Sequence, residues 1–412
     1  MTDIVSRADI ALKRDLCDHC LGRVFALIGT GTTNEARGQS ARAEVRLERE
    51  KRKEEFPPHE KCWLCGDIFD SLPRFAEAVI KALSKVEYNN FLIGTRVDPE
   101  IQEKEERLWG EVGQDTAEPI KAELNREIGK IVEARVEKPV EFATPDVVAL
   151  IDTRFAQVDL DVSPLFVYGR YRKLVRDIPQ TRWPCRMCRG KGCERCNFTG
   201  KMYLTSVQEI VGDPVQAAGE GTDHFFHGMG REDIDARMLG NGRPFVIEIR
   251  EPRKRNLDLE SLENIINENG KDRVEVIGLR PSSRDEVRKV KAASPNKTYR
   301  VDVAIHGKVD EAKINEVLQS FKRIRITQQT PVRVAHRRAD IAREREIIDL
   351  HLEELGEASF TFVVRTEAGT YVKEFVHGDN GRTKPNLSEA LGVPCEVRAL
   401  DVIEVNDGTS EE

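Results

Sequence analysis

One short segment combines acidic, basic, aromatic and glycine residues in a way that suits covalent chemistry. Residues 224–248 read HFFHGMGREDIDARMLGNGRPFVIE, and their glycines permit a sharply turning loop before a strand. A carboxylate held in this loop beside Arg231 and Arg237 would stay ionised, because nearby cations favour the charged form. Such a carboxylate is suited to act as a nucleophile. The candidates are Asp233 and Asp235; the alternative is that both only cap turns or pair with the arginines at the surface.

The spacing of the cysteines indicates metal sites rather than disulfides. Eight of the nine cysteines form C-x2-C pairs. They make two quartets: Cys17, Cys20, Cys62 and Cys65, and Cys185, Cys188, Cys193 and Cys196. Four thiolates from two such knuckles suit tetrahedral zinc, and the charged N-terminus lacks the apolar core of a secretion signal. Neither quartet leaves an open coordination position, so we expect two structural zinc sites. The alternatives for a single pair are redox or core cysteines, and the remaining Cys395 is expected to be a small core residue.

Two basic segments are candidates for contact with an RNA backbone. Around the second quartet, Lys and Arg surround a single acid, Glu194. Residues 322–345 hold eight Lys and Arg, including Arg337 and Arg338, against two acids. A local excess of positive charge in a chain of net charge −7 is typical of a phosphate-binding surface. The alternative for the second segment is a solvated, partly helical face.

Composition and missing motifs exclude several classes of protein. The chain of 412 residues is 39% hydrophobic and 33% charged, and it contains no apolar run of about 18 residues that could cross a membrane. We therefore expect a cytoplasmic protein without a membrane partner. No phosphate-binding or dinucleotide loop is present, which argues against a nucleotide cofactor. The signatures of hydrolytic zinc and serine enzymes are also missing.

The elements that must position these residues are mixed strands and helices. Residues 73–173 alternate helical and strand patterns and predict a separate α/β domain, with strands at 90–97, 147–152 and 157–162 and a helix after Pro119. Beyond residue 203, strands are predicted at 245–250, 273–278, 298–305, 323–327, 332–335 and 359–365, and helices at 259–268, 309–318 and 341–355. The charge-dense run 44–60 is expected to be a solvated helix. Without strict βαβ alternation, the fold class is α+β.

Three segments together resemble the pseudouridine synthases. G-R-E-D at residues 230–233 resembles the catalytic loop of that family, whose tRNA-acting members carry one essential aspartate. K-T-Y-R-V at residues 297–301 strengthens the match, and residues 367–383 contain G-T-Y-V-K, similar to a further family element. With its cysteine pairs, a middle domain similar to a THUMP RNA-binding domain and a basic cysteine knuckle, essentially the whole chain resembles the archaeal-type synthase that makes pseudouridine 54 and 55 in the tRNA T loop.

The resemblance implies a role for each matching residue. Asp233 would be the nucleophile, with Asp235 as the alternative that the residues alone leave open. Tyr299 would stack on the flipped uracil and help to remove the C5 proton, and Lys373 would pair with the aspartate. The substrate contacts would be Tyr299, Tyr371, Arg231, Arg337 and Arg338. Attack on the sugar or on the base stays open, and the isomerisation itself needs no cofactor.

The resemblance also implies the domain organisation. The expected parts are an N-terminal zinc-binding module (1–72), a THUMP-like RNA-binding domain (73–180), a four-cysteine zinc knuckle (181–202) and a mixed-sheet catalytic domain (203–412). The expected function is isomerisation of uridine in the tRNA T loop, and the partner is the T loop and arm of tRNA. The alternative is a non-catalytic tRNA-binding or delivery factor. A THUMP-containing methyltransferase or thiolase would need an S-adenosylmethionine or ATP loop, which the sequence lacks.

Overall fold

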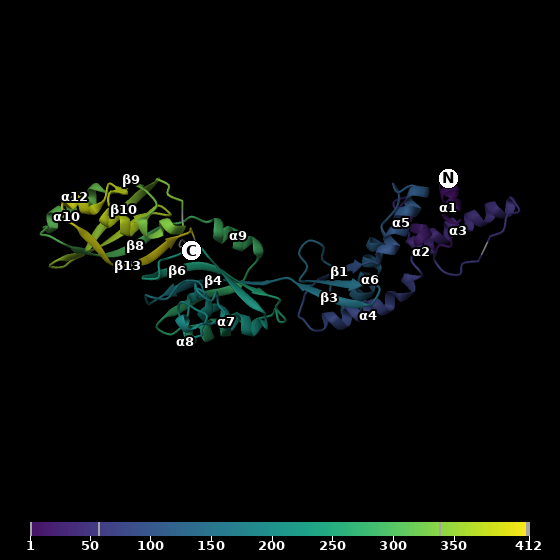
Figure 1. Ribbon diagram of the computed structural model, residues 1–412, viewed down its shortest axis with the longest axis horizontal. Coiled ribbons are helices and arrows are strands. Elements are labelled where there is room, and N and C mark those ends of the chain that lie inside the picture. Colours follow the sequence, from purple (N-terminus) through teal and green to yellow (C-terminus); the bar gives the residue numbers. More distant parts are fainter. Residues whose placement is uncertain (1, 57, 338, 409–412) are drawn as a thin grey trace. The chain divides into compact units, whose positions relative to one another are not determined.

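The structure is a computed structural model that describes residues 2–56, 58–337 and 339–408, with the backbone alone at residues 2, 3, 336 and 337. The chain divides into two compact units (Figure 1). The first unit extends to Ser163 and includes Arg253–Arg255; the second begins at Pro164 and contains the rest. Every helix in the described ranges is too short or too polar to span a bilayer.

The first unit combines helices with a small mixed sheet. Its helices are α1 (Thr2–Ala11), α2 (Asp18–Arg23), α3 (Asn34–Lys51), η1 (Ile68–Ser71), α4 (Leu72–Leu83), α5 (Pro99–Val112) and α6 (Ile120–Val136), and its strands are β1 (Phe91–Arg96), β2 (Val147–Asp152) and β3 (Gln157–Val162). Strand β1 runs parallel to β2, and β3 is antiparallel to β2. Alternate residues of β1, among them Phe91 and Ile93, are buried in the same core as the apolar stripe of α6. The buried face of the strand, which repeats every two residues, therefore packs in one core with the buried face of the helix, which repeats every 3.6 residues.

The second unit is built on a long mixed sheet. Its strands are β4 (Leu165–Lys173), β5 (Asp223–Gly228), β6 (Ala236–Arg250), β7 (Val274–Pro281), β8 (Asn296–Ile305), β9 (Ile324–Gln328), β10 (Arg343–Leu355), β11 (Ser359–Thr366), β12 (Thr383–Lys384) and β13 (Cys395–Asn406). Its helices are η2 (Glu194–Cys196), α7 (Val207–Gly219), α8 (Leu259–Asn269), α9 (Arg284–Ala292), α10 (Glu311–Ser320), η3 (Val332–Arg337), α11 (Val372–His377) and α12 (Leu387–Leu391). Among the described residues the strand order is β12-β9-β10-β11-β8-β13-β6-β4-β7, with β5 paired to β6. The predicted α+β class with a mixed sheet is confirmed.

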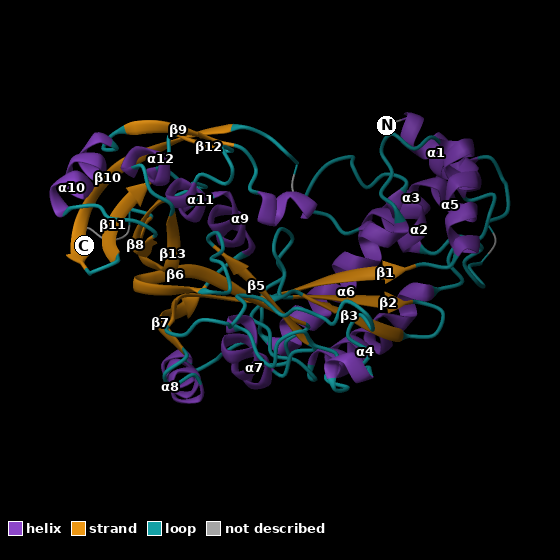
Figure 2. Ribbon diagram, turned by 60° about the vertical axis from the view of Figure 1, so that its left-hand side comes forward, coloured by secondary structure: helices purple, strands orange, loops and turns teal. Residues whose placement is uncertain are grey.

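The sheet brings together two halves that are distant in sequence. Strand β13 is antiparallel to β8 and parallel to β6, so it joins them. Figure 2 shows α7 and α8 against the half that contains β4 to β7, and α10 to α12 against the half that contains β8 to β11. Each half has its own apolar core, and Tyr299 on β8 packs against both cores. The centre of the sheet, where β6, β13 and β8 lie side by side, therefore links the two halves.

Several sequence predictions for individual elements are confirmed. The strands predicted at 147–152 and 157–162 have those bounds as β2 and β3, and the helix after Pro119 is α6. Predicted strands at 245–250 and 298–305 lie within β6 and β8, and the predicted helix at 259–268 lies within α8. These segments have clear apolar periodicity, which reports which face is buried.

Other predictions for elements are wrong. Residues 341–355 are predicted as a helix, but Arg343–Leu355 form strand β10, which pairs with β9 and β11 on its two edges. Residues 332–335, predicted as a strand, lie in the 3-10 helix η3. The charge-dense run is helical only to Lys51, where α3 ends. The expected loop across 224–248 is short, because β5 and β6 occupy most of that segment.

Two further segments of the second unit differ from the sequence prediction. Gly240 lies inside β6, where an added Cβ would come 1.6 Å from the Ile403 carbonyl oxygen of β13, so this glycine permits close approach of the two strands. Residues 165–173, which the sequence prediction assigned to the middle domain, form β4 between β6 and β7. The hydrogen bonds of β4 to both neighbours explain why it belongs to the second unit.

Candidate active site

A short loop between β5 and β6 carries Asp233. Gly230 in this loop has φ +77°, in the left-handed region that glycine enters without strain. The Ala236 N–H donates to the carbonyl oxygen of Asp233 at 3.1 Å, which closes the turn before β6 begins. The Asp233 side chain is 35% exposed, so its carboxylate is accessible to a substrate.

Two cations from separate elements approach the carboxylate of Asp233. Arg333 of η3 places Nη1 2.9 Å from Oδ2, and Lys373 of α11 places Nζ 3.8 Å from the same oxygen. The Lys373 Nζ also lies 2.6 Å from Oδ2 of Asp235. Burial opposes ionisation of Asp235, but the hydrogen bond and charge of Lys373 outweigh it and lower the pKa of Asp235. The loop therefore presents two carboxylates to one lysine, and Asp233 alone is also paired with Arg333.

Arg333 is itself held by a buried acid. Its Nε lies 2.7 Å from Oε1 of Glu374, whose side chain is 2% exposed. Burial lowers the pKa of Arg333, but the carboxylates of Glu374 and Asp233 outweigh this effect and raise it above its ordinary value. Glu374 follows Lys373 in α11, so one helix supplies both a cation near Asp233 and the support for the second cation.

A buried polar network lies behind the loop. Glu232, next to Asp233, accepts hydrogen bonds from the Tyr171 hydroxyl at 2.7 Å and from Nε of Arg243 at 2.9 Å. The side chains of Glu232 and Arg243 are each 1% exposed. Arg243 also donates to the carbonyl oxygen of Met229 at 2.7 Å. A buried ion pair with this many hydrogen bonds holds its members in one geometry, which fixes the loop backbone on the N-terminal side of Asp233.

Two more buried side chains bind the main chain of the loop. Lys173 of β4 donates to the carbonyl oxygens of Asp233 at 3.2 Å and Ile234 at 3.0 Å. Gln180 donates to the carbonyl oxygen of Gly230 at 3.0 Å. Burial lowers the pKa of Lys173. These residues were not predicted from the sequence; the available signals were charged residues within apolar strands and the glutamate inside G-R-E-D.

Tyr299 lies on β8, opposite Val364 of β11 and Val402 of β13. Burial raises the pKa of Tyr299 to about 12, and the charge of Asp233 contributes in the same direction while Arg243 opposes it. The phenol is therefore protonated at neutral pH.

Lys297 precedes Tyr299 by two residues on the same strand and so lies on the same face of β8. Its Nζ donates to the carbonyl oxygen of Pro295 at 3.1 Å. Burial, aided by the charge of Arg243, lowers the pKa of Lys297 to about 8. This lysine belongs to the segment K-T-Y-R-V, but no role for it was predicted from the sequence.

Tyr371 is the residue immediately before α11, and its backbone is fixed by Gln328 at the end of β9. The Tyr371 N–H donates to Oε1 of Gln328 at 2.9 Å, and Nε2 of Gln328 donates back to the Tyr371 carbonyl oxygen at 2.9 Å. Gln328 is 1% exposed, so this reciprocal pair is shielded from water. The pair fixes the start of α11 and hence the position of Lys373.

The arginines that the sequence predicted near the site lie in environments that differ from one another. Arg231 lies over the ring of Trp183, with its Cζ 5.2 Å from the ring centre. Arg237 pairs with Asp401 of β13, at 2.6 Å between Nη2 and Oδ2. Arg337 ends η3, where the backbone alone is described, and Arg338 lies outside the described residues.

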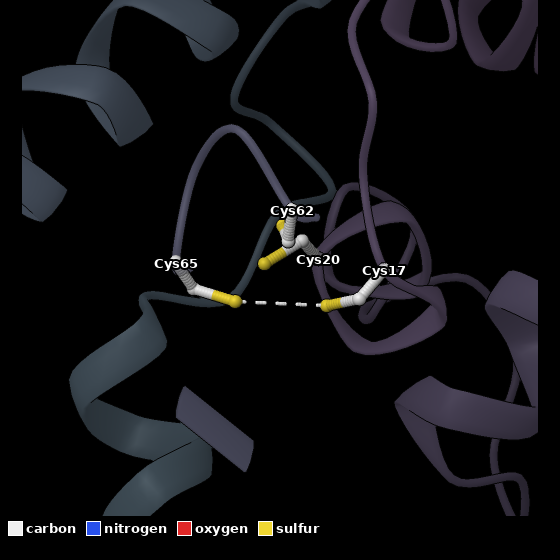
Figure 3. A group of neighbouring side chains, drawn as sticks. All are labelled: Cys17, Cys20, Cys62 and Cys65. Carbon is white, nitrogen blue, oxygen red and sulfur yellow. Dashed lines mark hydrogen bonds between the residues drawn. The ribbon is translucent and has the colours of Figure 1, made fainter. Parts of the chain in front are cut away.

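The first cysteine quartet has the geometry of a tetrahedral metal site. The sulfur atoms of Cys17, Cys20, Cys62 and Cys65 lie within 4.8 Å of one another, and Figure 3 shows them directed toward a common centre. The Cys17 and Cys65 sulfurs are 3.7 Å apart, too far for a disulfide. A tetrahedron with Zn–S bonds of about 2.3 Å has sulfurs about 3.8 Å apart. Buried Arg23 donates to the Cys20 sulfur at 3.5 Å, which suits a thiolate.

The second quartet has the same geometry in a tighter loop. The sulfurs of Cys185 and Cys193 are 3.9 Å apart, and those of Cys188 and Cys196 are 3.8 Å apart. Backbone N–H groups donate to these sulfurs, from Gly192 to Cys188 at 3.2 Å and from Gly200 to Cys196 at 3.3 Å. Such bonds stabilise thiolates. Both donor sets therefore fit zinc.

Comparison with known proteins extends these observations. A family model described as "Pus10, C-terminal" matches residues 166–406, more than half of the chain, and includes the Asp233 loop, β8 and α11. A second, described as "Pus10 THUMP domain, archaeal", matches residues 75–152.

Individual relatives agree with the family models. The tRNA pseudouridine synthase Pus10 of Methanothrix thermoacetophila is 40% identical over 98% of this chain and 95% of its own. That of Methanothermobacter marburgensis is 42% identical over 98% of this chain and 99% of its own. Among solved structures, a chain of a Cbf5-Nop10-Gar1 complex aligns with a TM-score of 0.32 and 20% identity over 48% of this chain and 45% of that chain, a similarity that adds no weight. The chain therefore belongs to the Pus10 family of tRNA pseudouridine synthases, which are isomerases.

Proposed function

We propose that this isomerase converts uridine to pseudouridine at positions 54 and 55 of the tRNA T loop, with Asp233 as its nucleophile. One observation carries the assignment of the nucleophile: the exposed carboxylate of Asp233 meets Arg333 at 2.9 Å on a loop fixed by the buried Glu232 network. The choice of the T loop rests on the motif resemblance, and the family supplies tRNA as the substrate class.

The proposed reaction begins with attack on the sugar. A carboxylate oxygen of Asp233 bonds to C1′ as the C1′–N1 bond breaks, and the uracil leaves with the electron pair on N1. The uracil then turns, and C5 bonds to C1′ as the aspartate oxygen leaves. The C5 proton is lost and N1 takes up a proton, so the product is an isomer of the substrate. Attack by the same carboxylate on the base is the alternative.

The surrounding residues would support this chemistry. Lys373 and Arg333 would hold the carboxylate of Asp233 in position until the bond to the substrate forms. Tyr299 would stack on the flipped uracil. Since the pKa of Tyr299 is about 12, its phenol would assist removal of the C5 proton through a hydrogen bond rather than as a resident phenolate. Tyr371, Arg231, Arg337 and Arg338 are proposed to contact the substrate.

The remaining parts of the chain would bind RNA and stabilise the fold. We assign residues 1–72 to a zinc-binding module, 73–163 to THUMP-like RNA binding, 181–202 to the zinc knuckle and 203–412, together with β4, to catalysis. The quartets would hold zinc in closed four-thiolate sites that contribute to folding rather than to the isomerisation. The proposed partner is the T loop and arm of tRNA.

The test maps pseudouridine in an unmodified tRNA transcript by carbodiimide-dependent primer extension. The intact protein should give stops at positions 54 and 55, and Asp233→Ala should give none while still binding the transcript. Stops elsewhere in the tRNA would overturn the T-loop assignment. Equal stops from both proteins would move the nucleophile to Asp235 or another acid. Tight binding without stops from either protein would favour the delivery factor.

A further inference from the structure

The knuckle is taken here as the zinc knuckle of residues 181–202 plus the next two residues. It presents cations that lack acidic partners. The side chains of Arg186, Arg189, Lys191 and Arg195 are all exposed. None of the four lies within 4.0 Å of a carboxylate in the described part of the chain, although Arg182 and Lys201 at the two ends of the knuckle are paired with Asp223 and Glu209. Four cations against the single acid Glu194 within ten residues make a positive surface.

The knuckle also exposes an aromatic ring. Phe198 is 74% exposed although it has an apolar side chain. Its φ is +60° and that of Asn197 is +48°, a left-handed conformation that bulky side chains rarely adopt. The Phe198 N–H donates to the carbonyl oxygen of Cys193 at 2.9 Å, so the turn is fixed by the cysteine loop. The ring is therefore held outward by its backbone rather than packed into a core.

The base of the knuckle touches the Asp233 loop. The rings of Trp183 and Tyr203, one on each side of the base, meet edge to face with centres 5.6 Å apart. Arg231, two residues before Asp233, lies over the Trp183 ring. The Met202 N–H donates to the Trp183 carbonyl oxygen at 2.9 Å, which closes the base. An RNA bound at Asp233 is therefore within the immediate neighbourhood of the knuckle.

Exposed cations around an exposed aromatic ring are the combination that recognises unpaired nucleotides. The cations bind the phosphates, and the ring offers a face on which any base can stack. An apolar protein partner fits less well, because it would leave four cations buried without partners. We propose that the knuckle binds an unpaired segment of the tRNA substrate, with Phe198 stacked on a base and Arg186, Arg189, Lys191 and Arg195 on the flanking phosphates. This inference rests on the proposed function for the location of the RNA at Asp233.

The first test changes the ring in the full-length protein. Phe198→Ala and Phe198→Leu remove the aromatic face, and Leu keeps the apolar area. Both should raise the Kd for an unmodified tRNA transcript by roughly tenfold. Phe198→Trp should keep the affinity, and its added fluorescence should be quenched when the transcript binds. The control Ile265→Ala removes an exposed apolar side chain of α8 in the same unit and should not change the Kd.

The second test measures how binding depends on salt. Arg189→Gln with Lys191→Gln should weaken binding and reduce the slope of log Kd against log salt by about 0.7 for each lost phosphate contact. The control, Lys271→Gln with Lys308→Gln, removes two exposed cations elsewhere in the second unit and should leave the slope unchanged. Zinc content and thermal melting should match the wild type for every variant, which shows that the knuckle is intact.

The two proposals fail separately. If the wild type modifies the T loop but Phe198→Ala and the paired Gln variant bind as tightly as the wild type, the knuckle proposal is overturned. If the wild type binds tRNA with these sensitivities but modifies another loop, the knuckle proposal stands and the T-loop assignment falls. If Phe198→Ala and Phe198→Trp both raised the Kd for the transcript by the same factor relative to the wild type, stacking on the ring would be excluded.

Discussion

Arg333 joins Asp233 to a buried acid: its Nη1 lies 2.9 Å from Asp233, and its Nε lies 2.7 Å from Glu374. Glu374 is shielded from water, so it holds the guanidinium more firmly than an exposed acid would. The guanidinium in turn restricts the carboxylate of Asp233 to a few orientations. The site thus has a rigid backing on the side of η3 and α11 as well as behind the loop.

We expect Arg333→Gln to slow the chemical step. The neutral amide cannot balance the charge of Asp233 and leaves Glu374 without its cation, and lost hydrogen bonds to charged groups cost about 1.5–3 kcal/mol each. The single-turnover rate on a tRNA transcript should fall by about tenfold or more, and Arg333→Lys should recover part of it. Arg288→Gln is the control, because Arg288 and its partner Asp285 are both exposed and lie outside the basic segment 322–345. A wild-type rate for Arg333→Gln would show that Lys373 alone suffices.

Glu232 should be more important for stability than an acid at the surface. Glu232→Gln leaves the buried charge of Arg243 without its partner, and breaking a buried pair costs about 3–5 kcal/mol. Asp285→Asn breaks an exposed pair with Arg288 and should cost less than about 1 kcal/mol. Urea unfolding of the two variants measures the difference. Equal losses would mean that the Glu232 network does not anchor the loop.

Lys297 should make stability depend on pH. Its pKa is about 8 in the folded protein against an ordinary value of 10.5, so folding below pH 8 must bury a charged ammonium. Between these values the unfolded chain binds more protons than the folded chain, and this contribution to stability therefore rises with pH. Lys297→Met should be more stable than the wild type at pH 7, by up to about 3 kcal/mol.

The comparison with Lys297→Met is made at two pH values. The advantage of the variant should shrink as pH rises from 8 and vanish above 10.5. Urea unfolding of both proteins at pH 7 and pH 10.5 measures this change, because contributions from other groups cancel between the two proteins. A constant difference at both pH values would show that burial does not shift this lysine.

Each cysteine quartet should bind one zinc ion. Metal analysis of the purified protein should give about two zinc ions per chain, and Cys17→Ser and Cys188→Ser should each remove about one. Cys395→Ser is the control, since Cys395 is a buried residue far in sequence from both quartets and should not alter the zinc content. Prolonged chelation should lower the thermal stability. A zinc content unaffected by Cys188→Ser would exclude the second site.

The reactive residues could be predicted from the sequence better than the residues that hold them in place. The motifs at residues 230–233 and 369–373 led to Asp233 and Lys373, and the sheet brings these residues to 3.8 Å. Glu374 could not be recognised, because a single acid in a short helix has no pattern that reveals burial. Lys173 and Gln180 bind main-chain oxygens about 50 to 60 residues away, and no local periodicity reports such bonds.

The prediction of helices and strands from local sequence was limited in the same way. β2 and α6 alternate or repeat their apolar residues clearly, so their type and bounds were predictable. β10 contains charged residues such as Arg343, Glu344 and Arg345 at its start, which fit an exposed helix as well as a strand. Its pairing with β9 and β11 decides the outcome, and that pairing depends on residues elsewhere in the chain. Tertiary context therefore overrode the local pattern.

The most direct test of the nucleophile compares the variants Asp233→Asn and Asp235→Asn. Each substitution replaces one carboxylate oxygen by an amide NH2 group and changes little else. Tritium release from tRNA transcripts labelled at C5 of uridine reports the loss of the C5 proton during isomerisation. Asp233→Asn should lower the single-turnover rate by about 10³-fold or more, and Asp235→Asn should stay within about tenfold of the wild type, while both still bind the transcript. A rapid reaction by Asp233→Asn, with loss of activity in Asp235→Asn, would contradict the assignment of Asp233 as the nucleophile.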